Sequence, residues 1–289
     1  MDNWYTHAII ALILMGTQSF LYKVSAERNC NTALTTFSFM ATVAFLSSAL
    51  FFIRREPAPN MFYTLIMGIL NSSAFLLATM MHIEALKRLP GSIVYSIIRL
   101  NVVVVVLFSI IYFRDRPTVN QISGIVLAVF VILLLTRQAE PEKFSVKQTK
   151  RGLILVFISL FCGAIASISS KFAAMHANPL SFMAISYLFS TLFAIGLRNK
   201  LFHHGVQASD RNDKEALVIG FSIGIVNFAG YYAFLKALSI GPLSIVISII
   251  GLHFAIAILL SVLFYREKLT PSIMTGISLT ILSVILLHH

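Results

Sequence analysis

Long apolar runs alternate with short polar links along almost the entire chain. A run of about 20 apolar residues is long enough to cross the hydrocarbon core of a bilayer as a helix. Ten such runs can be placed, at residues 4–24, 32–53, 61–82, 91–113, 118–136, 152–174, 179–197, 215–236, 242–264 and 271–287. The pattern therefore predicts an all-α, polytopic membrane protein with ten transmembrane helices.

The composition is typical of a membrane protein, and it affects how the net positive charge is interpreted. Of the 289 residues, 58% are hydrophobic and 11% are charged, and the mean hydropathy is +0.87. Soluble domains are about half apolar and about a quarter charged. The net charge of +11 is carried mainly by the links, so we expect the basic residues to meet lipid headgroups rather than nucleic acid. We therefore expect a multi-pass protein of the cell or inner membrane.

The second half of the chain repeats the first. When the sequence is shifted by 152 positions, residues 84–118 fall on residues 236–270. The matched pairs include Ala85 with Ala237, Pro90 with Pro242, Ser96 with Ser248, Ser109 with Ser261, Arg114 with Arg266, Thr118 with Thr270 and Gly124 with Gly276. We therefore divide the chain into a first five-helix repeat with its connecting loop, residues 1–148, and a second five-helix repeat, residues 149–289.

Five spans in each repeat is an odd number, so the second repeat must enter the membrane upside down. Inverted repeats recur in secondary transporters, where the substrate site lies near the midplane between the halves. Two similar halves packed in opposite senses can exchange conformations and open the site to the other side. The organisation predicts a secondary transporter or exchanger, with a small-molecule solute and membrane lipid as its partners.

Two repeated segments carry a resemblance to a known family. ALKRLPGSIVYSI (85–97) with FRDRPT (113–118), echoed by ALSIGPLSIVISI (237–249) with YREKLT (265–270), resembles the drug/metabolite transporter (DMT) superfamily, ten-helix EamA-type family. The resemblance covers essentially the whole chain and implies a permease. It does not specify the solute, because the superfamily includes carriers of amino acids, nucleotide sugars, sugar phosphates, choline-like cations and drugs.

Loop charges and the resemblance disagree about orientation. Lys and Arg are usually more frequent in cytoplasmic links. Here they are concentrated in the links at 136–151 and 198–215, which favours both termini outside. The resemblance implies both termini inside, and the orientation stays open.

Arg99 interrupts the fourth predicted span. A guanidinium at the centre of a span costs about 2.5–3.5 kcal/mol on insertion scales. It either reaches headgroups or a neighbouring helix's carbonyls, or it lines a cavity and binds a carboxylate or phosphate. Tyr95, one turn earlier, shares its face, and the repeat partner of Arg99 is Gly251. A charge added to only one copy of a repeated scaffold favours substrate binding by Arg99 and Tyr95.

Other polar residues at membrane depth are weaker candidates for the site. Asn227 and Tyr231 lie one helical turn apart, and Asn71 and Gln18 lie within the third and first spans. Each either bonds to a neighbouring helix or lines the cavity. Gly220 and Gly224 form a GxxxG pattern, which predicts close helix packing.

Acidic residues are missing from the interiors of the predicted spans; Glu84, at the end of the third span, comes nearest. Proton-coupled efflux of cationic drugs through an embedded carboxylate needs such a residue, so this mechanism is disfavoured. No phosphate-binding loop, nucleophile–base pair or metal-ligand cluster is evident. We therefore expect no enzyme activity, no cofactor and no bound metal.

Together these features favour transport of a small polar metabolite that bears a carboxylate or phosphate, amino acids included. One alternative is an exporter of apolar or cationic compounds that uses the 24 Phe residues. Another is a lipid-translocating membrane subunit, in which Arg99 binds a lipid phosphate. The sequence also leaves open a homodimer.

Overall fold

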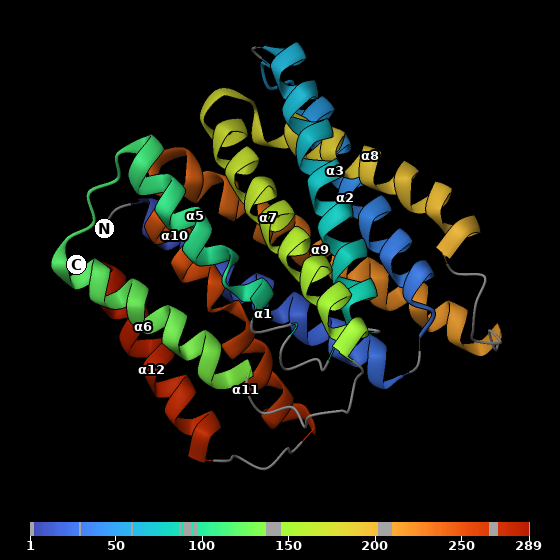
Figure 1. Cartoon of the computed structure of the whole chain (residues 1–289). Helices are drawn as coiled ribbons and strands as arrows, with labels where there is room; N and C mark the ends of the chain where they lie inside the picture. The colour runs from blue at the N-terminus through green and yellow to red at the C-terminus, as the bar shows by residue number, and fades with distance from the viewer. Residues whose placement is uncertain are drawn as a thin grey trace.

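The chain is described by a computed structural model that covers residues 3–28, 30–58, 60–86, 88–89, 94, 97–136, 146–201, 210–265 and 271–288. Within these ranges every regular element is a helix (Figure 1). The prediction of an all-α fold is therefore confirmed.

The helices follow the predicted spans closely. They are α1 (Asn3–Glu27), α2 (Thr32–Arg54), α3 (Met61–Leu86), α5 (Asn101–Phe108), the π-helix η1 (Ser109–Phe113), α6 (Val119–Thr136), α7 (Val146–His176), α8 (Pro179–Leu201), α9 (Asp210–Ile240), α10 (Leu243–Gly251), α11 (His253–Tyr265) and α12 (Pro271–His288). Both α7 and α9 begin before their predicted spans. The added turn of α7 contains the good helix formers Lys and Gln, and that of α9 contains Asp210 and Asp213, which are favoured near a helix N-terminus.

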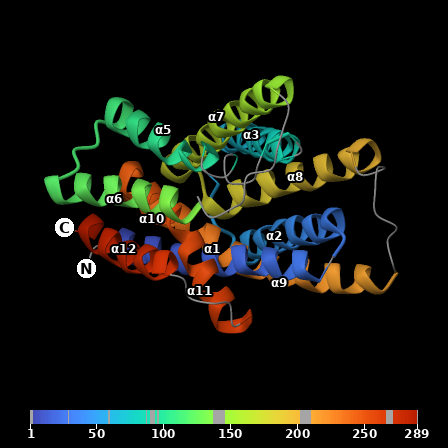
Figure 2. The same ribbon diagram turned by 60° about the horizontal axis from the view of Figure 1, so that its bottom comes forward.

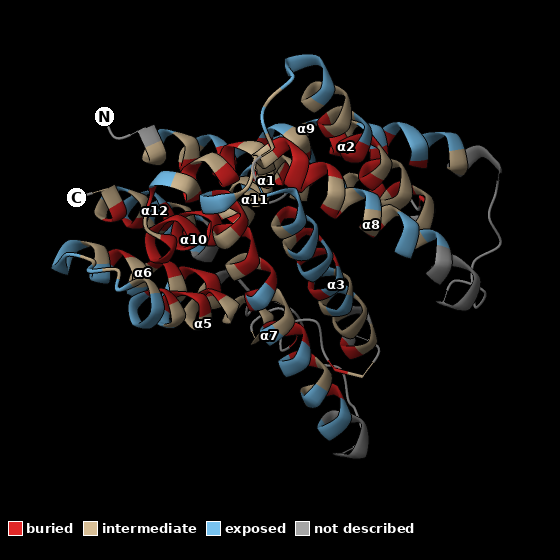
Figure 3. Ribbon diagram, turned by 90° about the horizontal axis from the view of Figure 1, so that it is seen from above, coloured by how far each residue is buried: buried red, intermediate tan, exposed pale blue. Residues whose placement is uncertain are grey.

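Among the described residues, six segments are long and apolar enough to cross a membrane: Trp4–Glu27, Ala33–Arg54, Met61–His82, Lys150–His176, Asp213–Ile240 and Leu243–Tyr265. Four shorter apolar helices accompany them, at Ile97–Phe113, Val119–Leu134, Pro179–Ile195 and Met274–His288. The outward faces of both the longer and the shorter helices are apolar. For example, Phe45, Ile111 and Leu263 are 71%, 78% and 71% exposed. In Figure 3, buried positions turn toward neighbouring helices and exposed ones turn outward. Such a surface suits lipid.

Helices of the first repeat pack mainly against helices of the second repeat, and equivalent helices make equivalent contacts. Helix α1 lies along α9, and α3, the counterpart of α9, lies along α7, the counterpart of α1. Helix α2 packs against its own counterpart α8, and α6 against its counterpart α12, as Figures 1 and 2 both show. Reciprocal pairing of this kind is what a two-fold axis produces. The repeats are therefore interlocked rather than adjacent, as the inverted repeat requires.

Short links define two faces of the molecule. The termini face holds the start of α1, the end of α12 and the links 55–60, 114–118 and 241–242. There, Tyr5 donates a hydrogen bond to the Val284 carbonyl, so the two ends of the chain lie together (Figure 1). The opposite face holds the ends of α3 and α11 and the starts of α2, α7 and α9.

Both repeats break one span at the same position. In the second repeat the helix is interrupted at Leu252, between α10 and α11. In the first repeat the turn falls at Leu100, which is the repeat partner of Leu252. The Leu100 and Leu252 amides each donate to the carbonyl three residues back. Interrupted helices at matched positions are the usual surroundings of a transporter's binding site.

Glycines let α9 approach α2 closely. A Cβ at Gly224 would lie 2.5 Å from the Thr42 Cβ, and one at Gly220 would lie 2.5 Å from the Thr35 carbonyl oxygen. Neither position has room for a side chain. The GxxxG pattern thus faces a neighbouring helix.

We predict that Gly224→Ala destabilises the protein by about 1–3 kcal/mol, the usual cost of overpacking a tight contact. The thermal unfolding midpoint in detergent should fall by several degrees. Ala229→Val is the control, because Ala229 lies exposed on the same helix and has room for the added atoms. Equal midpoints for the two variants would show that the α2–α9 contact is not tight.

Candidate functional site

A cavity of about 370 Å³ lies between the two repeats. Helices α1, α2 and α3 of the first repeat and α7, α8 and α9 of the second all contribute to its wall. On α3 the lining runs from Asn71 to His82, and on α7 from Ser159 to Ser170. The α3 stretch extends from the middle of that helix toward the opposite face, whereas the α7 stretch covers the middle of its own helix. The cavity therefore occupies the centre and the opposite-face half of the molecule.

The wall of the cavity carries no fixed charge among the described residues. Its polar groups are amides, hydroxyls and the imidazole of His82, and its apolar part includes Phe39, Phe75 and Phe234. With no ammonium, guanidinium or carboxylate on the wall, hydrogen bonds and ring contacts provide the binding interactions. Such a mixture suits a solute with a planar or apolar body and a few polar groups.

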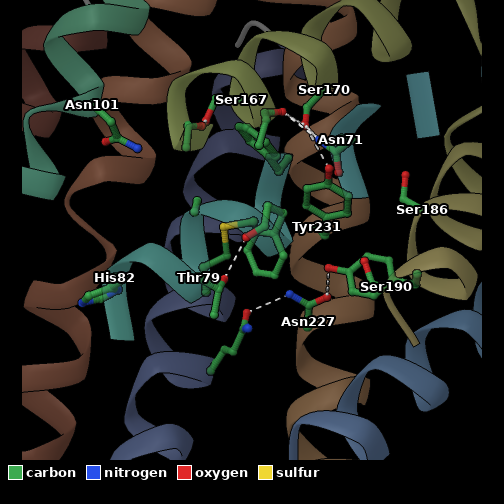
Figure 4. A pocket seen from close by; sticks show the side chains of 18 of the residues that line it. Asn71, Thr79, His82, Asn101, Ser167, Ser170, Ser186, Ser190, Asn227 and Tyr231 are labelled. Atoms are coloured by element: carbon green, nitrogen blue, oxygen red, sulfur yellow. Dashed lines mark hydrogen bonds between the residues drawn. The ribbon is translucent and has the colours of Figure 1, made fainter. Parts of the chain in front are cut away.

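Asn71 ties α3 to α7 at the cavity wall. Its Nδ2 donates to the Ala166 carbonyl at 2.8 Å and reaches the hydroxyls of Ser169 and Ser170 at 3.0 and 3.1 Å. The Ser170 hydroxyl in turn lies 2.9 Å from the Tyr231 hydroxyl on α9. The amide, two serines and a tyrosine thus join three helices (Figure 4).

Asn227 ties α9 to α1 in an equivalent way. Its Nδ2 donates to the Gln18 Oε1 at 2.9 Å, and its Oδ1 accepts from the Tyr187 hydroxyl at 2.7 Å. Gln18 then donates to the Tyr22 hydroxyl at 3.1 Å. The α1–α9 pair is the repeat counterpart of the α7–α3 pair. In each pair, one asparagine side chain hydrogen-bonds from one helix to the other. Both amides line the cavity and bond between helices at once.

Arg99 lies directly at the break of the fourth span, next to Leu100. Its Nη1 is 3.4 Å from Nε2 of His253, which flanks the matching break at Leu252. The His253 Nδ1 is 2.7 Å from the Ile250 carbonyl, so Nδ1 carries the proton and Nε2 accepts from the guanidinium. A neutral imidazole does not cancel the charge. Arg99 therefore places a cation where the two interrupted helices meet.

The relation of Arg99 to the cavity is indirect. Its sequence neighbours Ile98 and Asn101 line the wall, whereas Arg99 is not among the lining residues. It lies within electrostatic range of His82, which does line the wall, and its guanidinium lies 5.8 Å from the Phe254 ring. Of the remaining candidates, Gln18, Asn71, Asn227 and Tyr231 line the cavity, and Tyr95 lies outside the described residues.

Several lining residues were missed by the sequence analysis, including His82, Asn101, Ser186, Tyr187 and Ser190. Asn101 and His253 occupy equal positions in the two repeats. The structure separates them, since Asn101 lines the cavity and His253 bonds to Arg99. A search for polar residues on either side of the repeated Leu100 and Leu252 would have found both.

At the termini face, two charged side chains hydrogen-bond to groups on either side of the link between α9 and α10. Lys171 is 7% exposed and donates from Nζ to the carbonyls of Leu238 and Gly241, at 2.6 and 2.8 Å. These carbonyls belong to the end of α9, where a cation is favoured by the helix dipole. The ammonium also lies 5.7 Å from the Phe113 ring. Lys23 of the first repeat lies 5.6 Å from the ring of Tyr265, the repeat counterpart of Phe113.

Asp115 holds the other side of the same link. Its Oδ2 accepts hydrogen bonds from the backbone amide and the hydroxyl of Ser244, at 3.1 and 2.7 Å, and from the Ser109 hydroxyl. Ser244 lies in the first turn of α10, so an acid from the first repeat caps a helix of the second. The equivalent acid of the second repeat, Glu267, lies outside the described residues.

An interlocked inverted repeat, an apolar outer surface and a central polar cavity define a multi-pass membrane transporter. The chain belongs to the EamA-like transporter family, whose sequence profile matches residues 2–137 and again residues 150–288. The resemblance to the drug/metabolite transporter superfamily is thereby confirmed, as is a multi-pass membrane location. The family consists of transporters rather than enzymes.

Comparison with other proteins adds the fold alone. No curated protein matches the chain in sequence. A solved structure described only as the crystal structure of a protein is similar to this chain with a TM-score of 0.77 and 15% sequence identity. The match covers 99% of this chain and 96% of the other.

We predict that Asp115→Ala destabilises the protein by about 1.5–3 kcal/mol, the range for hydrogen bonds to a charged group. Asp115→Asn keeps one acceptor oxygen and should lose less. The measurement is thermal or denaturant unfolding in detergent, and Arg116→Ala, at an exposed position of the same link, is the control. If Asp115→Ala unfolds at the same midpoint as Arg116→Ala, the cap on α10 contributes nothing.

Proposed function

We propose that the protein carries small polar metabolites that bear a carboxylate or phosphate, amino acids included, across the membrane. All ten apolar segments cross the bilayer in this proposal, and the two repeats exchange conformations to expose the central cavity to each side in turn. The cavity supports this proposal, because it lies between the repeats, extends toward the opposite face and stops short of the links at the termini face.

One observation carries the preference for anions: Arg99 meets His253 where the two interrupted helices come together. A guanidinium matches the geometry of a carboxylate or phosphate with paired donors. Because the cavity wall itself is neutral, an anionic group of the solute has its most favourable position beside Arg99 and His82. The neutral wall then accommodates the rest of the solute.

A second candidate function rests on the same wall. Aromatic side chains and the absence of fixed charge on the described wall favour apolar or weakly cationic compounds. An exporter of such compounds would not depend on Arg99.

We predict that Arg99→Ala lowers uptake of anionic solutes at least ten-fold, since a hydrogen bond to a charged group contributes about 1.5–3 kcal/mol. Proteoliposomes containing wild type, Arg99→Lys or Arg99→Ala would be compared using radiolabelled phenylacetate, L-leucine and glucose 6-phosphate. Arg99→Lys keeps the charge and should retain part of the rate. Arg116→Ala is the control for losing a basic residue outside the membrane.

Tetraphenylphosphonium completes the panel as a cationic, apolar probe. Uptake of this cation alone, with no anionic solute transported, would contradict the proposal and support the second candidate. Equal uptake of an anionic solute by wild type and Arg99→Ala would remove Arg99 from the site but leave transport itself intact.

A further inference from the structure

Ser186 on α8 differs from the other serines around the cavity. Its side chain lines the wall and the residue is 2% exposed, yet its Oγ makes no hydrogen bond within the described part of the chain. More than nine in ten buried polar groups in proteins have a partner. Leaving a hydroxyl unpaired in a buried position is unfavourable. This hydroxyl therefore needs a partner from the cavity.

Neighbouring hydroxyls show how such a group is normally satisfied. Ser167 and Thr191 each donate back to the carbonyl four residues earlier in their own helix. Ser190, one turn after Ser186 on α8, lies 3.0 Å from the Ser72 hydroxyl on α3. Ser186 makes neither kind of bond. On α8, therefore, Ser190 bonds to another helix, whereas Ser186 lines the cavity and has no partner in the described part of the chain.

The position of Ser186 adds a second constraint. Figure 4 shows Ser186 on one side of the cavity and His82 and Asn101 on the other. His82 lies within electrostatic range of Arg99. The guanidinium of Arg99 is therefore nearer to the His82 side of the cavity than to the Ser186 side. Rings of Phe75, Phe234 and Tyr231 also line the space. A bound solute would thus have its polar groups at separated ends of an apolar body.

We infer that Ser186 is a hydrogen-bonding subsite for an uncharged polar group of the solute, at the end away from its acidic group. The inference rests on the proposed function and makes it more specific. A hydroxyl both donates and accepts, so Ser186 can pair with a hydroxyl, amide or keto group. The solute class is therefore a carboxylate or phosphate whose apolar body carries a second, neutral hydrogen-bonding group.

Selectivity follows from the same bond. An analogue that lacks the hydrogen-bonding group binds more weakly to such a site, because it leaves the buried polar group of the protein unpaired. For one neutral hydrogen bond we expect a preference of about three- to ten-fold for the hydroxylated member of a matched pair. The Asn71 and Asn227 amides would contribute less discrimination, because their partners are already within the protein.

The test uses two pairs of probes that differ by one hydroxyl: 4-hydroxyphenylacetate with phenylacetate, and L-threonine with L-2-aminobutyrate. Affinities for the purified full-length protein in detergent are measured by calorimetry or thermal shift. Wild type should prefer the hydroxylated member of at least one pair. Ser186→Ala should abolish that preference without weakening the binding of the other member. Ser186→Cys, nearly the same size but a weak donor, should lose most of it.

Ser190→Ala is the matched control, and the stability of the ligand-free protein is the second readout. Removing an unpaired hydroxyl should leave the unfolding midpoint of Ser186→Ala unchanged or raised, whereas Ser190→Ala loses its bond to Ser72 and should unfold earlier. Thr191→Ala, which removes a hydroxyl of the same helix that does not line the cavity, should keep the wild-type preference ratio. A lower midpoint for Ser186→Ala, or an unchanged preference in it, would overturn the inference.

The remaining outcomes separate the inference from the proposed function. If wild type binds both members of each pair equally, the subsite is refuted while anion transport stands. If wild type binds none of the four probes and transports no anionic solute, the proposed function fails and the subsite fails with it.

Discussion

The link between α9 and α10 depends on hydrogen bonds to two opposite charges, Lys171 and Asp115. The last carbonyls of one helix and the first amides of the next have no partner within their own helix, so where they are buried other parts of the protein must satisfy them. Lys171 supplies donors to the last carbonyls of α9, and Asp115 supplies an acceptor to the first turn of α10. Because Asp115 belongs to the first repeat, a backbone amide in the first turn of a second-repeat helix has its hydrogen-bond acceptor in the other half of the chain.

At the cavity, too, each repeat supplies hydrogen-bond partners to the other, here through neutral side chains. Asn71 and Asn227 each lie on the third span of their repeat and each bond to the first span of the other. Any relative movement of the repeats therefore changes the cavity wall and its hydrogen bonds together. The described part of the wall is neutral, and Arg99 places a cation beside it.

Much of this arrangement could be predicted from the sequence, because apolar periodicity and the repeat depend on residue type alone. The repeat located the partners of Arg99 and Pro90, and polar residues at depth identified Gln18, Asn71, Asn227 and Tyr231. The breaks at Leu100 and Leu252 could not be found in this way, because leucine is a good helix former. Ser186 was missed for another reason: serines within helices usually bond to their own backbone, and only the coordinates show which one does not.

The interlocked packing has a consequence for biogenesis. Helices α1 and α3 find their main neighbours, α9 and α7, only in the second half of the chain. When the ribosome has finished residue 136, the first repeat is made but the surfaces of α1 and α3 that will form the core still lack their neighbours. The Asn71 Nδ2 and the Gln18 Oε1 therefore have no partner from the second repeat until the ribosome has extended the chain far enough to supply α7 and α9.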